Sequence, residues 1–151
     1  MHKAIAWLVL ATICLSTTTL FCAPPPQAGE QQSLYKRLGG FDALAAVTDD
    51  FIGRMAVNPQ LKRFFSGFNE SSLARIREHV VDFLCQATGG PCKYHGQDMK
   101  TAHTGLKITD ADWDAAVKDL NATLDKFKVP QKERGEVLAA VSGLKGDIVG
   151  H

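Results

Sequence analysis

The sequence lacks an excess of charge of either sign, which limits the partners that the protein can have. Seventeen lysine and arginine residues stand against sixteen aspartate and glutamate residues in 151 positions. A nearly neutral chain offers no basic surface to nucleic acid and has no acidic tail. The chain also lacks internal repeats of solenoid period, and its 45% hydrophobic and 22% charged content is typical of an ordinary globular domain. We therefore expect one domain and no nucleic-acid partner.

Cysteine is scarce, and its spacing excludes the common cysteine-based sites. Cys14 and Cys22 lie in or beside the apolar N-terminal segment. Cys85 and Cys92 are not spaced like zinc ligands, and the chain has no C-x-x-C-H haem-attachment motif. In an oxidising compartment, a disulfide closing the turn between Cys85 and Cys92 is expected, and two free thiols are the alternative.

The N-terminal residues differ in character from the rest of the chain. A short positive start, an apolar run over residues 4–15 and a Pro-rich spacer are typical of an export signal. We expect a signal peptide at 1–23, a linker at 24–32 and the globular domain at 33–151. Lipidation of Cys22 and an uncleaved anchor are alternatives, because residues 4–23 are about long enough to span a bilayer. The expected location is the periplasm of a bacterium, with membrane attachment only through this N-terminus.

Strand-like alternation is absent after residue 31, and the apolar periodicity is helical throughout. Helix ends are marked by cap and breaker residues, such as the capping box of Thr109 and Asp112 and the pair Gly89-Gly90. We expect an all-α fold with two or three short helices and four longer ones, whose apolar stripes lie within residues 44–55, 73–87, 113–127 and 137–148.

One histidine stands where a packing residue is expected. Met99, Ala102, His103 and Leu106 are spaced as the inward stripe of a short helix. A lone histidine on an apolar face is more often a core residue that is hydrogen-bonded to a carbonyl than a ligand of a metal or haem. His95, in contrast, lies in a glycine-containing loop and is expected to be solvated.

A second histidine strengthens the ligand interpretation of His103. His79 falls about 40° from Phe83 on the flank of another helix. A flat apolar cofactor with a central metal suits two helices that each present an imidazole near apolar walls. Phe51, Phe64 and Phe65 can supply such walls, and the alternative is that these phenylalanines are simply core residues.

From residue 34 to residue 149 the chain resembles the truncated (2/2) haemoglobins, most closely those of group I. The matching motifs are, in order, LYKRLGG, DDF, FFSG, a helix ending in GGP, KYHG, DMKTAHTGL and ITDADWDA. The resemblance implies a globin-like two-over-two sandwich, with helices B and E over G and H, around haem b, an iron protoporphyrin IX. Non-covalent haem is expected, because LKGDIVG lacks the helix H histidine that relatives with attached haem use. The implied function is reversible binding of a diatomic gas, O₂, NO or CO.

The resemblance also implies roles for individual residues. His103 takes the position of the proximal iron ligand, and His79 takes a position at which some relatives supply a sixth ligand. Tyr94 and Lys100 fall near the haem edge, and no catalytic residue is implied. The residues expected to contact haem are Phe51, Ile52, Phe64, Phe65, Ile76, His79, Val80, Phe83, Tyr94, Met99, Lys100, His103 and Val117.

The distal residues depart from the family pattern. Many group I members place a tyrosine that hydrogen-bonds bound oxygen where this chain has Ile52. The helix E positions that face the iron are Ile76 and Val80, where glutamines often assist that tyrosine. An apolar distal pocket is therefore expected.

Two other functions remain open at this stage. An NO dioxygenase or peroxidase-like haem enzyme is one, although the chain has neither the distal tyrosine nor a flavin or reductase motif, so any reductase is a separate partner. A haem-free helical interaction module is the other, and the matching motif around His103 speaks against it.

Overall fold

The computed structural model describes residues 32–151, and these residues form helices and no strand. The expected leader at 1–23 and nearly all of the linker at 24–32 lie outside this part. The helical elements are α1 (Leu34–Arg37), α2 (Gly40–Val57), η1 (Lys62–Phe65), α3 (Glu70–Ala87), α4 (Met99–His103), α5 (Asp110–Lys126), α6 (Gln131–Ser142) and α7 (Lys145–Ile148). Four of them are long, as expected, and four are short, where two or three were expected. The helical content confirms the predicted all-α class. None of these helices has the length and apolar character that crossing a membrane requires.

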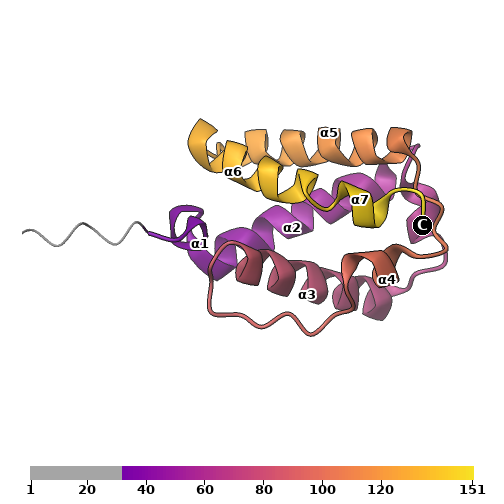
Figure 1. Ribbon diagram of the computed structural model, residues 1–151, viewed down its shortest axis with the longest axis horizontal. Coiled ribbons are helices and arrows are strands. Elements are labelled where there is room, and N and C mark those ends of the chain that lie inside the picture. The colour runs from indigo at the N-terminus through magenta and orange to yellow at the C-terminus, as the bar shows by residue number, and fades with distance from the viewer. Residues whose placement is uncertain (1–31) are drawn as a thin grey trace, which may run out of the picture. The chain divides into compact units, whose positions relative to one another are not determined.

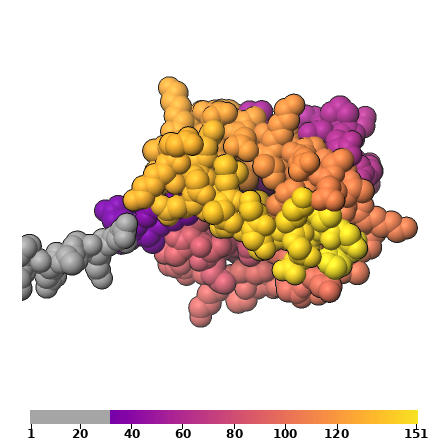
Figure 2. Space-filling model, turned by 45° about the horizontal axis from the view of Figure 1, so that its top comes forward, coloured from indigo at the N-terminus to yellow at the C-terminus, as the bar shows by residue number. Residues whose placement is uncertain are grey.

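The four long helices form two layers. α2 and α3 pack against each other in one layer, and α2 also packs against α5 in the other layer, which α5 shares with α6 (Figure 1). Figure 2 shows α6 and α7, in yellow, spread across one face of the molecule. Leu120 and Leu124 of α5 and Val137 of α6 are buried at the centre. This arrangement is the predicted two-over-two sandwich.

Side-chain caps start four of the described helices, with Ser33 capping α1. The Asn69 side chain accepts a hydrogen bond from the backbone of Ser72 at the start of α3, and the Asp98 side chain caps α4. The capping box of Thr109 and Asp112 opens α5, as the sequence predicted. Each cap satisfies backbone N–H groups that the first turn of a helix leaves without a partner.

The last predicted helix is divided in the structure, contrary to the expectation of one continuous stripe. α6 ends at Ser142 and α7 starts at Lys145. The backbone N–H of Leu144 donates to the carbonyl of Val141, a tighter turn than the α-helical one. Gly143 stands at the break, and because glycine has a low helix propensity, ending the helix there costs little free energy.

Two further expectations about packing are wrong. α4 ends at His103, so Leu106 lies in the following turn and is 44% exposed instead of extending an inward stripe. Gly105, with φ of 86°, makes that turn in a conformation that favours glycine. Phe127 caps the end of α5 and is 38% exposed rather than buried inside the helix.

A buried carboxylate joins the η1 corner to the start of α5. Asp112 is 1% exposed and accepts hydrogen bonds from Arg63 Nη2 at 2.5 Å, Gln60 Nε2 at 2.7 Å and Thr109 Oγ1 at 2.8 Å. Burial opposes the charge, but these bonds outweigh it and hold the pKa of the Asp112 carboxyl well below its usual range. The corner that carries Phe64 and Phe65 is therefore anchored by charge.

Replacing this carboxylate should destabilise the fold in a pH-dependent way. Asp112→Asn leaves Arg63 without its partner and should lower the free energy of unfolding at pH 7 by about 2–4 kcal/mol. Because the folded-state pKa is depressed, the contribution is complete above the ordinary aspartate pKa of about 3.9 and is lost as the pH falls below it. Urea unfolding at pH 7 and pH 3 should therefore show a smaller difference between variant and parent at pH 3.

The exposed Asp114, two residues further on, provides the control for this experiment. Asp114→Asn should change the free energy of unfolding by no more than about 0.5 kcal/mol. Equal destabilisation by the two substitutions would contradict the anchoring role of Asp112.

Candidate functional site

His103 is the last residue of α4, and its ring orientation is set by its own helix. The Nδ1 atom lies 2.7 Å from the carbonyl oxygen of Met99, one turn earlier, so an Nδ1–H donates to that oxygen. In this tautomer the lone pair is on Nε2, which is the arrangement found in metal-ligating histidines. α4 contains no buried residue, and the His103 ring is only half-buried. His103 is therefore not a core histidine, although the carbonyl bond alone would also suit one.

His79 on α3 belongs to an aromatic cluster. The Tyr94 ring lies edge-on to the His79 ring, with centroids 6.2 Å apart, and edge-on to the Phe83 ring at 5.3 Å. The Tyr94 backbone N–H donates to Gln86 Oε1 at 2.8 Å, and its hydroxyl donates to the carbonyl of Gln97 at 2.7 Å. Burial and the nearby Asp98 carboxylate raise the Tyr94 pKa. Tyr94 thus remains a neutral side chain, fixed beside His79.

The residues predicted for the distal side are apolar, and one of them, Val80, lines an interior cavity. Ile52 is 8% exposed, whereas Ile76 is half-buried on α3. Phe51 and Val80 line an enclosed, mainly apolar cavity of about 180 Å³, to which α2, α3, α5 and α6 all contribute. None of these four side chains carries a hydrogen-bond donor.

Thr48 is a polar residue in this cavity that the sequence did not mark as special. It is fully buried, and its hydroxyl has no hydrogen-bond partner in the described part of the chain. Thr88, also in the lining, donates its hydroxyl to the carbonyl of Leu84 at 2.7 Å. A space with so few free polar groups does not hold water well and suits small apolar molecules. Its lining comes from four helices and so has no local sequence signal.

The remaining predicted residues lie on three elements. The Arg63 guanidinium covers the Phe64 ring at 4.3 Å, and the Phe65 ring is edge-on to Phe68 with centroids 6.5 Å apart. Lys100 is exposed on α4. The other two, Met99 on α4 and Val117 on α5, are half-buried.

Two further features connect the elements of the site. Cys85 and Cys92 are joined by a disulfide with Cα atoms 5.7 Å apart, which ties the end of α3 to the following loop. In the described residues α3 packs against α2, whereas α4 packs against α7. His79 and His103 therefore stand on elements with separate supports.

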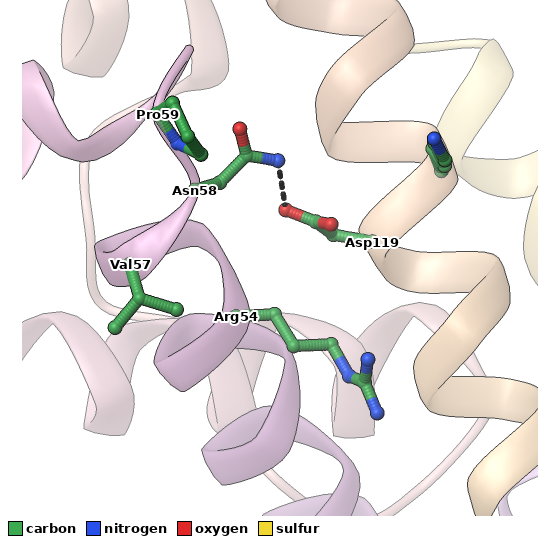
Figure 3. Close-up of a pocket in the computed structure, with 6 residues that line it drawn as sticks. Arg54, Val57, Asn58, Pro59 and Asp119 are labelled. Atoms are coloured by element: carbon green, nitrogen blue, oxygen red, sulfur yellow. Dashed lines mark hydrogen bonds between the residues drawn. The ribbon is translucent and has the colours of Figure 1, made fainter.

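An open depression of about 430 Å³ lies elsewhere, where the end of α2 meets α5 (Figure 3). There the Asn58 amide donates to Asp119 at 2.7 Å, next to the exposed Val57. The depression contains none of the predicted site residues and is less enclosed than the apolar cavity. We therefore do not assign the site to it.

The donor set identifies the class of protein. Residues 32–151 contain no group of three or more His, Cys, Asp or Glu side chains that could bind a bare metal ion. A single imidazole with its second nitrogen engaged, together with apolar and aromatic walls, fits a metal that a macrocycle already holds, as in haem. Fold and donor set together define a two-over-two haem globin.

Comparisons with known proteins give the family. The model of the family described as bacterial-like globin matches residues 33–149. A group 1 truncated haemoglobin of Mycolicibacterium paratuberculosis is 34% identical over 79% of this chain and 85% of that protein. The chain therefore belongs to the bacterial-like truncated globins, with group 1 homologues, a family of gas-binding haem proteins.

Solved structures of relatives agree with this assignment. The truncated haemoglobin of Tetrahymena pyriformis in its Fe(III) form has a TM-score of 0.73 and 28% identity, covering 80% of this chain and all of that one. The 2/2 haemoglobin of Synechococcus sp. PCC 7002, in the cyanomet state with covalently attached haem, has a TM-score of 0.72 with the same identity and coverage.

Proposed function

We propose that His103 ligates the iron of a non-covalently bound haem b and that the protein binds a diatomic gas reversibly on the opposite face. The observation that carries this proposal is the hydrogen bond between His103 Nδ1 and the Met99 carbonyl, which directs Nε2 away from its own helix. Haem b supplies an iron with a coordination position for O₂, NO or CO. Non-covalent attachment is supported by α6 and α7, neither of which contains a histidine.

Because its distal side is apolar, the protein should bind O₂ with low affinity. Bound O₂ carries partial negative charge, and a hydrogen bond to it contributes about 1–2 kcal/mol, up to about tenfold or more in affinity. Ile52, Ile76 and Val80 cannot make that bond. CO and NO depend less on such a bond, so this pocket favours them relative to a pocket with a distal tyrosine.

His79 is the α3 residue that can supply a second imidazole. Its ring lies beside Tyr94 and Phe83, so ligation of iron would require the ring to leave this cluster or α3 to shift. As a sixth ligand, His79 would compete with an incoming gas and reduce its apparent affinity.

Two further parts of the proposal concern the surroundings of the protein. Export is supported by the apolar run over residues 4–15 and by the disulfide, since disulfides persist in oxidising compartments such as the periplasm. A separate reductase partner is proposed because binding of O₂ or CO requires ferrous iron.

The assignment of His103 can be tested by its removal. His103→Gly should reduce haem affinity by at least about tenfold, because one strong ligand bond is lost, and added imidazole should restore the Soret spectrum of the parent. His95→Gly, in the loop before α4, is the matched control and should retain haem normally. Unchanged haem retention and an unchanged proximal-ligand signature in His103→Gly would refute the assignment.

The distal pocket can be tested by restoring a donor. Ile52→Tyr should slow O₂ dissociation about tenfold, by the energy of one hydrogen bond, with a much smaller effect on CO dissociation. Ile52→Phe introduces the same ring without the hydroxyl and controls for its volume. Equal O₂ dissociation rates in the two variants, measured by stopped flow, would show that position 52 does not face the ligand.

Absorption spectra of His79→Ala determine the role of His79. Low-spin ferric bands in the parent should become high-spin in the variant, because the sixth ligand is removed. His95→Ala should leave the bands unchanged. A parent protein that is already high-spin, or a variant that stays low-spin, would exclude His79 as the ligand.

A further inference from the structure

The loop of residues 88–98 connects the helix of His79 to the helix of His103. Figure 1 shows this loop leaving the C-terminal end of α3 and running back toward α4. Its position therefore affects both histidine-bearing helices. The contacts that hold this loop in place therefore help to position the two histidines of the proposed haem site.

The first part of the loop is held tightly. The Gly90 N–H donates to the carbonyl of Cys85 at 2.8 Å, and the Tyr35 N–H donates to the carbonyl of Thr88 at 2.8 Å. A side chain at Gly90 would place its Cβ 2.6 Å from the Tyr35 ring and 2.7 Å from Cys85 Sγ. The turn at Gly90 thus requires glycine and is closely packed.

The second part of the loop has few restraints. From residue 91 to residue 97, the described structure contains no backbone–backbone hydrogen bond. The restraints on this part toward α3 are the disulfide at Cys92, the bond from the Tyr94 N–H to Gln86, and the contacts of the Tyr94 ring with Phe83 and His79. On the loop, all of these restraints act on residues 92–94, so loss of one weakens the others.

The disulfide is the covalent member of this set. Cys85 is 0% exposed on the buried side of α3, so its sulfur is a fixed point in the core. Cys92, only two residues before Tyr94, is tied to that point. Without the bond, the loop beyond Gly90 depends on the Gln86 contact and the Tyr94 ring alone.

We propose that the Cys85–Cys92 disulfide positions the haem site: it holds Tyr94 against His79 and limits the movement of α4 with His103, so its redox state sets how firmly haem is retained. This inference rests on the proposed function. A dithiol reductant opens the bond by thiol–disulfide exchange. The two thiols of the reductant become a disulfide, and Cys85 and Cys92 each gain one hydrogen atom.

The test measures haem loss from the full chain to an excess of apomyoglobin. Protein treated with a dithiol, desalted without air and shown by thiol titration to have its disulfide open should lose ferric haem at least about threefold faster than oxidised protein. Cys92→Ser, which leaves the buried Cys85 in place, should lose haem at the faster rate with or without dithiol. Equal rates in oxidised and reduced parent would overturn the proposal.

A second variant separates positioning from general stabilisation. In Tyr94→Ala the ring contact with His79 is already absent, so opening the disulfide should change haem loss much less than in the parent. If the disulfide acted only on global stability, opening it would lower the unfolding temperature and would accelerate haem loss by the same factor in both backgrounds. That result would refute the positioning role.

The ferric absorption spectrum provides an independent readout. A change in the ratio of low-spin to high-spin bands on reduction of the disulfide is expected, because His79 loses its neighbour. Failure of the chain to take up haem at all would refute the proposed function. A stable haem complex that is indifferent to dithiol, in contrast, would leave the proposed function intact and refute this inference alone.

Discussion

The short helix α4 has no buried side chain of its own, so its position depends on supports from neighbouring parts of the chain. The Asp98 side chain caps the first turn, and the carbonyl of Met99 holds the ring. The segment after α4 is bonded to the C-terminus, with the Lys107 N–H donating to the His151 carbonyl at 3.0 Å. The loop before α4 is tied to α3 by the disulfide. A five-residue helix could not keep an imidazole in place without these supports.

The two sides of the proposed haem site differ in how they are built. The His103 side relies on hydrogen bonds and on a covalent restraint at a distance. The opposite side relies on apolar packing, with Ile52 buried on α2 and with Phe51 and Val80 lining a cavity in the core. In the proposed function, such a wall offers no hydrogen bond to bound O₂, so access to the iron and competition from His79 would set the affinity for the gas. In the proposed function, O₂ retention and haem retention would therefore depend on different parts of the chain.

Much of the fold could be predicted because its signals are local. The capping box of Thr109 and Asp112 acts within one helical turn, so a single sequence reveals it. The break between α6 and α7 and the early end of α4 were missed. An apolar residue such as Leu144 or Leu106 keeps the helical spacing even where the backbone has left the helix, because periodicity reports side-chain pattern and not hydrogen bonding.

The sequence by itself determined the all-α class, the capping box that starts α5, and the choice of His103 over His95 as the candidate ligand. It also gave the pairing of Cys85 with Cys92 as a hypothesis. Only the tertiary structure decided that Tyr94 packs on His79, that Gln86 holds Tyr94, and that four helices leave an apolar cavity beside Val80. These contacts join segments that are distant along the chain or run through an irregular loop. Their geometry depends on how the helices pack, and no residue pattern within one segment encodes that.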